Sequence, residues 1–294
     1  MVAVVVRVPA TIANLGPGFD ALGLALSWHN EVRVERTSGG LSISATGPGA
    51  ETLPRDETNL VVRALTSIMG DEPLSVSVNQ IIAIPNGRGF GSSAAAVIGG
   101  LVAGRALAGT SDTDEQLLEK AIAFEGHADN VAPCVLGGIT ISTDTSTIRI
   151  EPPASIRPLV CVAPSAVRTD AARAALAKEI TRSDAVANIG RAALLVAALT
   201  EGRSDVLMDA TEDRLHQPTR FELMPDSGAL VHALRSKGMA AFLSGAGPSV
   251  AALVDAEAAD EAVKTARGVV PDGWEVRLES FDPEGARVVS QREK

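Results

Sequence analysis

The chain has 294 residues and a net charge of −10, from 26 lysines and arginines against 36 aspartates and glutamates. Its 46% hydrophobic and 21% charged residues are the proportions of an ordinary globular protein, which excludes disordered, collagen-like and low-complexity classes. The acidic balance, without a basic cluster, argues against nucleic acid and against anionic membrane surfaces as partners.

The sequence also argues against a membrane-spanning or zinc-dependent protein. The longest apolar stretch, residues 94–104, is far shorter than the roughly 18 residues that a membrane span needs. The two cysteines, Cys134 and Cys161, form no CxxC, and the four histidines show no paired metal-ligand spacing. We therefore expect a soluble cytoplasmic protein without structural zinc.

The first half of the chain mixes β-rich runs with helical periodicity. We predict strands over residues 2–8, 31–36, 41–45, 74–84, 139–142 and 148–150, and helices over 59–69, 94–108 and 114–124. Two prolines between residues 151 and 155 then mark a connection between domains. The boundary predicts one domain over residues 1–153 and a second over 154–294.

The second half continues the same mixture of helices and strands. Strands are predicted over residues 159–163, 239–243, 249–254 and 274–278, and helices over 170–179, 184–200, 204–215, 226–237 and 256–267. There is no internal repeat. The whole pattern predicts an α+β protein.

The strongest local signal is the glycine loop PNGRGFGSSA at residues 85–94, which runs from a strand into an alanine-rich helix. Glycines let backbone N–H groups point inward, serines add hydroxyls, and the helix N-terminus adds partial positive charge, so the loop suits a phosphate. It is not a Walker loop, which requires GxxxxGK[ST]. The alternative is that glycine and alanine only allow the helix to pack closely on the sheet.

Two further loops of the same character are PATIANLGPGFD at residues 9–20 and LSGAGPS at residues 243–249. Each alone could be turn chemistry. Together and in this order, the three loops resemble the signatures of the GHMP small-molecule kinase superfamily. The central signature PxxxGxGSSA is matched at Pro85, Gly89, Gly91, Ser92, Ser93 and Ala94.

Within the superfamily the chain is most similar to the homoserine kinases. The resemblance rests on residues 14–20, 125–133, 136–138 and 213–220 and covers nearly the full length. It implies a two-domain α+β GHMP fold, with an N-terminal left-handed βαβ domain and a C-terminal ferredoxin-like domain. The implied activity is ATP-dependent phosphorylation of the side-chain hydroxyl of L-homoserine, a step of threonine biosynthesis. Relatives also imply a homodimer, which no sequence pattern indicates.

The resemblance assigns the ATP and Mg²⁺ sites. It places the phosphates on the loop that contains Pro85, Arg88, Gly89, Phe90, Gly91, Ser92 and Ser93, and adenine at Asn59. Ser93 and Glu125 would hold Mg²⁺, a hard cation that accepts a hydroxyl and a carboxylate. The residues alone favour a helix cap for Asn59 and a solvated acid at a helix end for Glu125. The segment between Glu125 and His127 is several residues shorter than in many relatives. Its length affects where the Glu125 carboxylate lies relative to the metal.

The resemblance also assigns the substrate groups. An amino acid needs an anion for its ammonium, here Asp20, and cations for its carboxylate, here Arg173 and Arg220. Arg173 follows Thr169 by one helical turn, so both could face one pocket. Alone, each arginine could be a surface salt-bridge partner. The remaining substrate positions are Asn14, His127, Asn130, Thr169 and Gly245.

Catalysis is assigned to Asn130, Asn14 and Arg173. Related kinases such as mevalonate kinase carry an aspartate base at the place of Asn130, and an amide cannot accept a proton at neutral pH. We therefore expect Asn130 and Asn14 to orient the hydroxyl, whose proton leaves late to a phosphate oxygen. Asp129 is an alternative base, although a supporting role fits it better.

Two other functions stay open. One is another GHMP kinase acting on a small alcohol such as mevalonate or shikimate, although those substrates carry no ammonium to pair with Asp20. The other is a non-catalytic protein that binds ATP and a ligand as a sensor.

Overall fold

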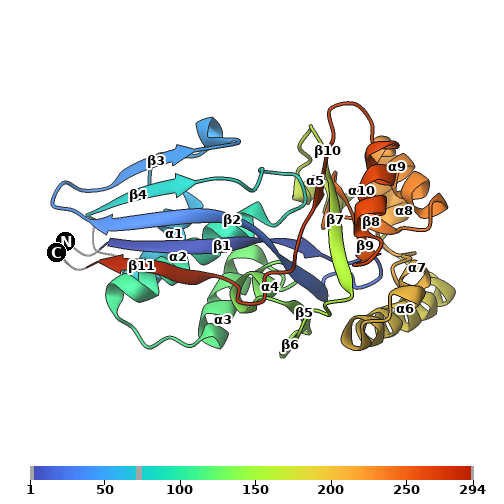
Figure 1. Ribbon diagram of the computed structural model, residues 1–294. Helices are drawn as coiled ribbons and strands as arrows, with labels where there is room; N and C mark the ends of the chain where they lie inside the picture. The colour runs from blue at the N-terminus through green and yellow to red at the C-terminus, as the bar shows by residue number, and fades with distance from the viewer. Residues whose placement is uncertain (1–2, 71–74, 293–294) are drawn as a thin grey trace.

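The computed structural model describes residues 3–70 and 75–292, which form two α+β domains side by side, each built on its own sheet (Figure 1). The first sheet has the strand order β11-β1-β2-β4-β3, with β5 paired to β2 and β6 to β5. Its strands are β1 (Ala3–Ala13), β2 (Leu22–Arg36), β3 (Ser42–Thr46), β4 (Val76–Ile81), β5 (Ile139–Ser142), β6 (Thr147–Ile150) and β11 (Arg287–Arg292).

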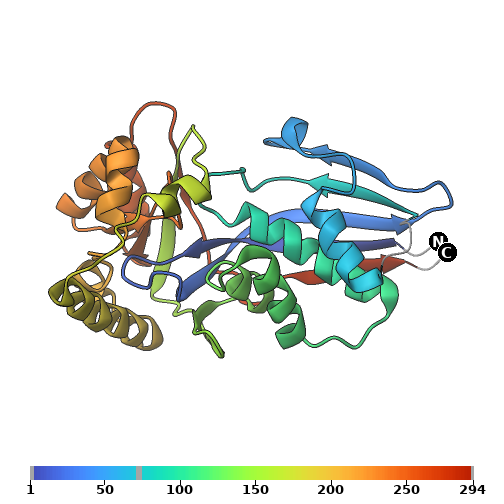
Figure 2. The ribbon, with the colours of Figure 1, turned by 180° about the vertical axis from the view of Figure 1, so that it is seen from behind.

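One face of this sheet is covered by helices, seen in front of it in Figure 2. They are α1 (Leu60–Met69), α2 (Ser92–Ala108), α3 (Asp114–Glu125) and α4 (Val131–Leu136). The parallel strands β3 and β4 are joined through η1 (Ala50–Thr52) and α1, which is the βαβ unit expected of the fold. All other described pairs in the sheet are antiparallel.

The core follows from the alternation of β1. Val4, Val6 and Val8 are fully buried while the residues between them are half-buried, so alternate side chains face the helices. Each such valine stabilises the fold by roughly 1.5–3 kcal/mol. From Val8 to Ala13 every residue is buried, because this end of β1 runs between the two domains. It delivers the first glycine loop to their junction.

The second sheet is antiparallel, with the order β10-β7-β9-β8. Its strands are β7 (Ile156–Val162), β8 (Ala240–Leu243), β9 (Val250–Asp255) and β10 (Glu275–Leu278). Numbered along the chain this is 4-1-3-2, the order of a ferredoxin-like domain, as predicted. The helices of this domain are α5 (Thr169–Ala174), α6 (Arg182–Glu201), η2 (Ser204–Val206), α7 (Leu207–Ala210), α8 (Gln217–Leu223), α9 (Pro225–Ser236) and α10 (Ala259–Arg267).

The structure extends two predicted strands, to Ala13 in β1 and back to Leu22 in β2, and adds the unpredicted helices α4 and α8. Three further differences concern the second half of the chain. The helix expected over residues 204–215 stops at Ala210, because the Asp213 carboxylate accepts hydrogen bonds from the backbone of residues 215–217 and opens a turn there instead. The helix expected over 170–179 ends at Ala174. The predicted strands 2–8 and 74–84 begin at residues that lie outside the described ones.

The third difference concerns the end of the chain. β11 returns from the second domain and pairs antiparallel with β1, so residues 287–292 complete the first sheet. The prediction that all of residues 154–294 belong to the second domain does not include this return of the chain to the first sheet. The predicted boundary at 153 falls in the connection between β6 and β7.

Of the described helices, α6 alone is long and apolar enough to cross a membrane by length and composition, and only 22% of its most apolar window is buried. The opposite side of α6 contacts the rest of the protein, because buried Asn188 donates hydrogen bonds to the Asp213 carboxylate and the Pro17 carbonyl. α6 is therefore a surface helix of the second domain with an exposed apolar face.

Candidate active site

The three glycine loops meet at the junction of the two domains. The Thr11 amide donates to the Phe90 carbonyl at 3.2 Å, and the Ser244 hydroxyl donates to the Gly89 carbonyl at 2.7 Å. A side chain at Gly89 would place its Cβ 2.2 Å from the Ser244 carbonyl oxygen, so only glycine allows the second and third loops to pack this closely. The loops therefore form one rigid assembly.

A cavity of about 610 Å³ opens beside these loops. It is lined by the start of α2, by the end of α3, by the segment 166–170 and by the third loop. α2 begins at Ser92 with Gly91 in the left-handed conformation, and no side chain of the described residues caps it. The N–H groups of its first turn therefore face the cavity without an internal acceptor, which makes this end of α2 an anion site.

The cavity also holds a hydroxyl and a carboxylate side by side. The Ser93 hydroxyl donates to Oε1 of Glu125 at 2.5 Å, although the two residues come from different helices. The short spacing between Glu125 and His127 thus leaves the carboxylate within reach of the phosphate loop. Among the described residues, no group of three or more histidine, cysteine or acidic side chains could hold a metal ion. This pair suits a cation that takes most of its ligands from phosphate and water.

The Asn130 side chain is fixed on both sides. Its Oδ1 accepts a hydrogen bond of 2.8 Å from the Thr11 hydroxyl, and its Nδ2 donates to Oδ1 of Asp129 at 3.4 Å. One N–H of Nδ2 therefore stays free, and Asn130 lines the cavity. Asp129 is buried and also lies 2.9 Å from Nδ1 of His127, whose pKa it raises. The Asp129 carboxylate thus contacts the side chains of both Asn130 and His127, which is consistent with a supporting role.

Next to the cavity, Asp20 and Arg173 form a bidentate ion pair, with N–O distances of 2.7 and 3.0 Å. The pKa of Arg173 is raised by this bond. The Asp20 amide donates to Oδ1 of Asn14, and Nδ2 of Asn14 donates to the Gly245 carbonyl at 3.0 Å. Asn14 and Asp20 both have positive φ, a strained conformation that is common where a loop positions functional groups.

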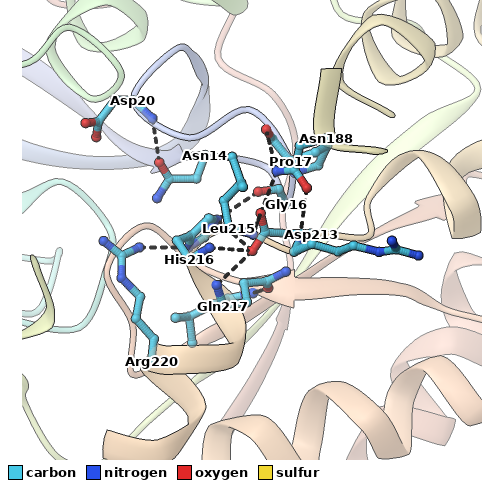
Figure 3. Close-up of polar contacts among 12 residues, drawn as sticks. Asn14, Gly16, Pro17, Asp20, Asn188, Asp213, Leu215, His216, Gln217 and Arg220 are labelled. Atoms are coloured by element: carbon cyan, nitrogen blue, oxygen red, sulfur yellow. Dashed lines mark hydrogen bonds and ion pairs between the residues drawn. The ribbon is translucent and has the colours of Figure 1, made fainter. Parts of the chain in front are cut away.

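Arg220 supplies a second guanidinium, buried and differently held (Figure 3). Its Nη1 donates to the Gly245 carbonyl at 3.1 Å and to Nδ1 of His216 at 3.0 Å. Nε2 of His216 is 2.8 Å from the Gly16 carbonyl and donates to it, so the ring is the neutral Nε2–H tautomer. Burial lowers the pKa of His216, which favours that neutral form.

Among the residues that the structure describes, Arg220 has no ion-pair partner, and Nη1 of its guanidinium bonds only to the Gly245 carbonyl and His216. Burial, followed by the charge of Arg173, lowers its pKa, and its buried Nε has no hydrogen-bond partner among the described residues. The Phe19 ring stands between the two guanidinium groups, with its centroid 5.6 Å from the guanidinium carbon of Arg173 and 5.4 Å from that of Arg220. A buried cation with an unused donor is a site for an anionic ligand.

The structure brings together most of the predicted site residues. Those that line the cavity are Gly89, Gly91, Ser92, Ser93, Glu125, His127, Asn130, Thr169 and Gly245. Asn14, Asp20, Arg173 and Arg220 connect to it through one another and through the Gly245 carbonyl.

Four predicted nucleotide contacts are not among the residues that line the cavity. Asn59 is buried at the start of α1, where its Oδ1 accepts from the Val61 amide and Nδ2 donates to the Pro54 carbonyl, as a helix cap does. The Phe90 ring is buried against Trp28. Arg88 donates to the Ala163 carbonyl and joins the loop to the second domain. Pro85 is likewise not among the residues that line the cavity.

Three further residues, Thr11, Asp213 and His216, shape the site although no role was predicted for them from the sequence. Thr11 is a hydroxyl inside the fully buried end of β1, a pattern that hints at a polar partner. The Asp213 side chain is buried and accepts four hydrogen bonds, from Asn188 and from the backbone of residues 215–217 (Figure 3). It positions His216 and, through that ring, Arg220.

Comparisons with known proteins show the family of the chain. The model of the GHMP kinases N terminal domain matches residues 59–138, and the model of the GHMP kinases C terminal domain matches 186–271. Two similar relatives are the homoserine kinases of Streptomyces avermitilis and Streptomyces coelicolor, each 48% identical in sequence. The aligned region covers 98% of this chain in both cases, 96% of the first relative and 94% of the second.

Solved structures give the same relationship. The crystal structure of homoserine kinase from Cytophaga hutchinsonii has a TM-score of 0.87 and 29% identity, with 98% of this chain and 97% of that chain covered. A mevalonate kinase crystal structure has a TM-score of 0.70 at 15% identity, over 95% of this chain and 99% of that one, and so shares the fold alone.

Proposed function

The chain belongs to the homoserine kinase family of the GHMP kinases, and we propose that it transfers the γ-phosphoryl group of ATP to the side-chain hydroxyl of L-homoserine. The product is O-phospho-L-homoserine, an intermediate of threonine biosynthesis. We place the enzyme in the cytoplasm, as a homodimer that uses Mg²⁺.

The observation that carries this proposal is the meeting of one carboxylate and two guanidinium groups beside the cavity. Asp20 provides the anion for an ammonium, and Arg173 and buried Arg220 provide cations for a carboxylate. An amino acid carries both charges on one carbon atom, so it can satisfy all three residues at once. A hydroxy acid such as mevalonate has no ammonium group and would offer Asp20 no cationic partner.

ATP would lie along the cavity with its phosphates at the N-terminus of α2. The unpaired N–H groups that follow Gly91 would bind the phosphate oxygens. Ser93 and Glu125 would hold Mg²⁺, which neutralises developing phosphate charge when bound. For the adenine we keep Asn59 as the predicted contact, although its amide is already engaged as a helix cap.

Asn130 would orient the attacking hydroxyl. Since its Oδ1 is taken by Thr11 and one N–H by Asp129, the other N–H can donate to the substrate oxygen and direct a lone pair toward the γ-phosphorus. No side-chain base is required, because the proton can pass late to a phosphate oxygen in a loose transition state. Asn14 supports the same pocket by joining Asp20 to the Gly245 carbonyl. Arg173 would hold the substrate carboxylate.

An ADP-release assay with ATP and Mg²⁺ tests the assignment. It compares L-homoserine, mevalonate, shikimate and a reaction without acceptor, and a mass spectrum of the product identifies the phosphorylated oxygen. Turnover with homoserine alone supports the proposal. Turnover with another alcohol instead would leave a GHMP kinase of different specificity, and ATP binding without any turnover would favour a sensor.

A further inference from the structure

The cavity beside the glycine loops is poor in permanently charged cations. Among the described residues that line it, Arg168 is the only arginine or lysine, whereas Glu125 and Asp170 both bring carboxylates. The phosphate loop adds no further cation, because the Arg88 guanidinium donates to the Ala163 carbonyl at 3.2 Å and Arg88 does not line the cavity. A triphosphate bound there would therefore depend on backbone N–H groups, on a bound metal cation and on Arg168 for positive charge.

The segment that carries Arg168 is held against the phosphate loop. The Val167 amide donates to the Gly87 carbonyl at 2.9 Å, and a Cβ added at Gly87 would lie 3.0 Å from the Ala166 Cβ. Gly87 also has a φ of +68°, so glycine suits both the turn and the close approach. The backbone of Arg168 thus directly follows a residue that is hydrogen-bonded to the loop proposed to bind the phosphates.

Arg168 also lies where the nucleotide and acceptor sites meet. It directly precedes α5, whose first two residues line the cavity. One helical turn further along, Arg173 forms the ion pair with Asp20 that we assign to the substrate. A phosphoryl group passes from the end of the nucleotide that faces the acceptor, so the γ-phosphate would lie at this end of the cavity.

The contacts of the Arg168 side chain leave part of its guanidinium available. Its Nε and Nη2 donate to the Asp170 carboxylate at 3.0 and 2.5 Å, and its side chain is 83% exposed. These bonds occupy one edge of the guanidinium, so the two N–H groups of Nη1 point away from Asp170. An exposed ion pair of this kind contributes little to stability. It orients the guanidinium without being needed for the fold.

We propose that Arg168 binds the γ-phosphate of ATP through Nη1, while Asp170 holds the other edge of its guanidinium. The proposal rests on the use of ATP proposed above but not on the identity of the acceptor. A guanidinium at the transferred group neutralises charge on its oxygens in a loose transition state. The Asp170 carboxylate stays exposed and also accepts a hydrogen bond of 2.8 Å from the Ala171 amide, so it keeps partners of its own.

Calorimetric titration of the full chain with ATP or ADP, each with Mg²⁺ and without an acceptor, tests the contact. Arg168→Gln should raise the dissociation constant for ATP roughly fivefold to thirtyfold and change that for ADP by less than about threefold, because only ATP carries the γ-phosphate. Combining Arg168→Gln with Asp170→Asn removes the pair without changing the net charge. This double variant should still weaken ATP binding at least about fivefold.

The matched control is the pair that Arg203 forms with Asp205. It has the same spacing of two residues and the same two bonds, both 2.7 Å long, and neither residue lines the cavity. Arg203→Gln combined with Asp205→Asn should therefore leave the dissociation constants for ATP and ADP unchanged.

Wild-type ATP affinity in the variant with Arg168→Gln and Asp170→Asn would overturn the proposal, because Arg168 would then only neutralise Asp170. An equal loss of ATP and ADP binding would overturn it too, since the guanidinium would not act at the γ-phosphate. The titrations need no acceptor, so a chain that binds ATP but does not phosphorylate homoserine would refute the proposed reaction and not this contact. A wild-type chain that binds no ATP would overturn both.

Discussion

Replacing Thr11 with valine removes one hydroxyl from the fully buried end of β1 and nearly preserves the side-chain shape. The hydroxyl makes a hydrogen bond of 2.8 Å to Oδ1 of Asn130. Without it, the Asn130 amide is held only by the long 3.4 Å bond to Asp129 and can turn or shift. If the amide directs the attacking oxygen, Thr11→Val lowers the rate of phosphoryl transfer although it touches neither ATP nor homoserine.

The size of the effect follows from the bond that is lost. A buried hydrogen bond contributes about 1–2 kcal/mol, so kcat should fall roughly fivefold to thirtyfold. The KM values for ATP and homoserine should change little, because their charged contacts remain. Thr11→Ser keeps the hydroxyl and should restore kcat to within about threefold of wild type.

The matched control is Thr140→Val on β5. Thr140 is as buried as Thr11, but its hydroxyl has no hydrogen-bond partner among the described residues, so its loss should leave kcat and the melting temperature unchanged or slightly improved. Steady-state kinetics and thermal unfolding of the three variants decide the matter. A Thr11→Val enzyme with wild-type kcat would refute the orienting role of Asn130, and an equal loss in Thr11→Ser would assign the effect to packing.

Three further predictions use other parts of the molecule. Asp20→Asn should raise the KM for homoserine roughly tenfold or more while the KM for ATP stays constant, because a charge-assisted bond to the ammonium is lost; unchanged kinetics would remove Asp20 from the substrate site. Glu125→Gln should raise the Mg²⁺ concentration needed for half-maximal activity, and a Mg²⁺ titration at fixed ATP checks this. Burial of Asp282 opposes ionisation, but hydrogen bonds from His29, the backbone and Arg287 outweigh it and lower the pKa from 3.8 to about 2. That pKa contributes about 2 kcal/mol of stability above pH 3.8, lost as the pH falls toward 2, and urea unfolding of Asp282→Asn at pH 7 should show this loss with the KM values unchanged.

The local parts of the site could be predicted from the sequence because their chemistry is local. The phosphate loop needs glycines, serines and a helix start in succession, and residues 85–94 contain all of them. The ferredoxin-like order of the second sheet came only with the family resemblance, since strand propensity does not specify which strands pair. β11 escaped detection because six residues after a long connection carry no pattern that links them to β1.

Contacts between distant segments could not be predicted in the same way. Arg173 is 153 residues from Asp20 along the chain, and their bidentate pair depends on how α5 is placed over the first loop. The break after Ala210 likewise depends on Asp213, a residue that helix periodicity treats as an ordinary polar position. In both cases the partner of a charged side chain is set by the tertiary structure and not by its neighbours in the sequence.

The Asp20–Arg173 pair explains how the proposed site could distinguish an amino acid from other small alcohols. The pair holds the two residues within 3.0 Å of each other, with one-third to one-half of each side chain exposed, so it exchanges partners at modest cost. A zwitterion that enters would give Asp20 an ammonium and Arg173 a carboxylate, replacing one ion pair with two. Arg220, which is buried and has no counter-ion within the described part of the chain, adds attraction for that carboxylate. A hydroxy acid would take Arg173 from Asp20 and leave the carboxylate of Asp20 unpaired, which costs free energy that no new contact repays.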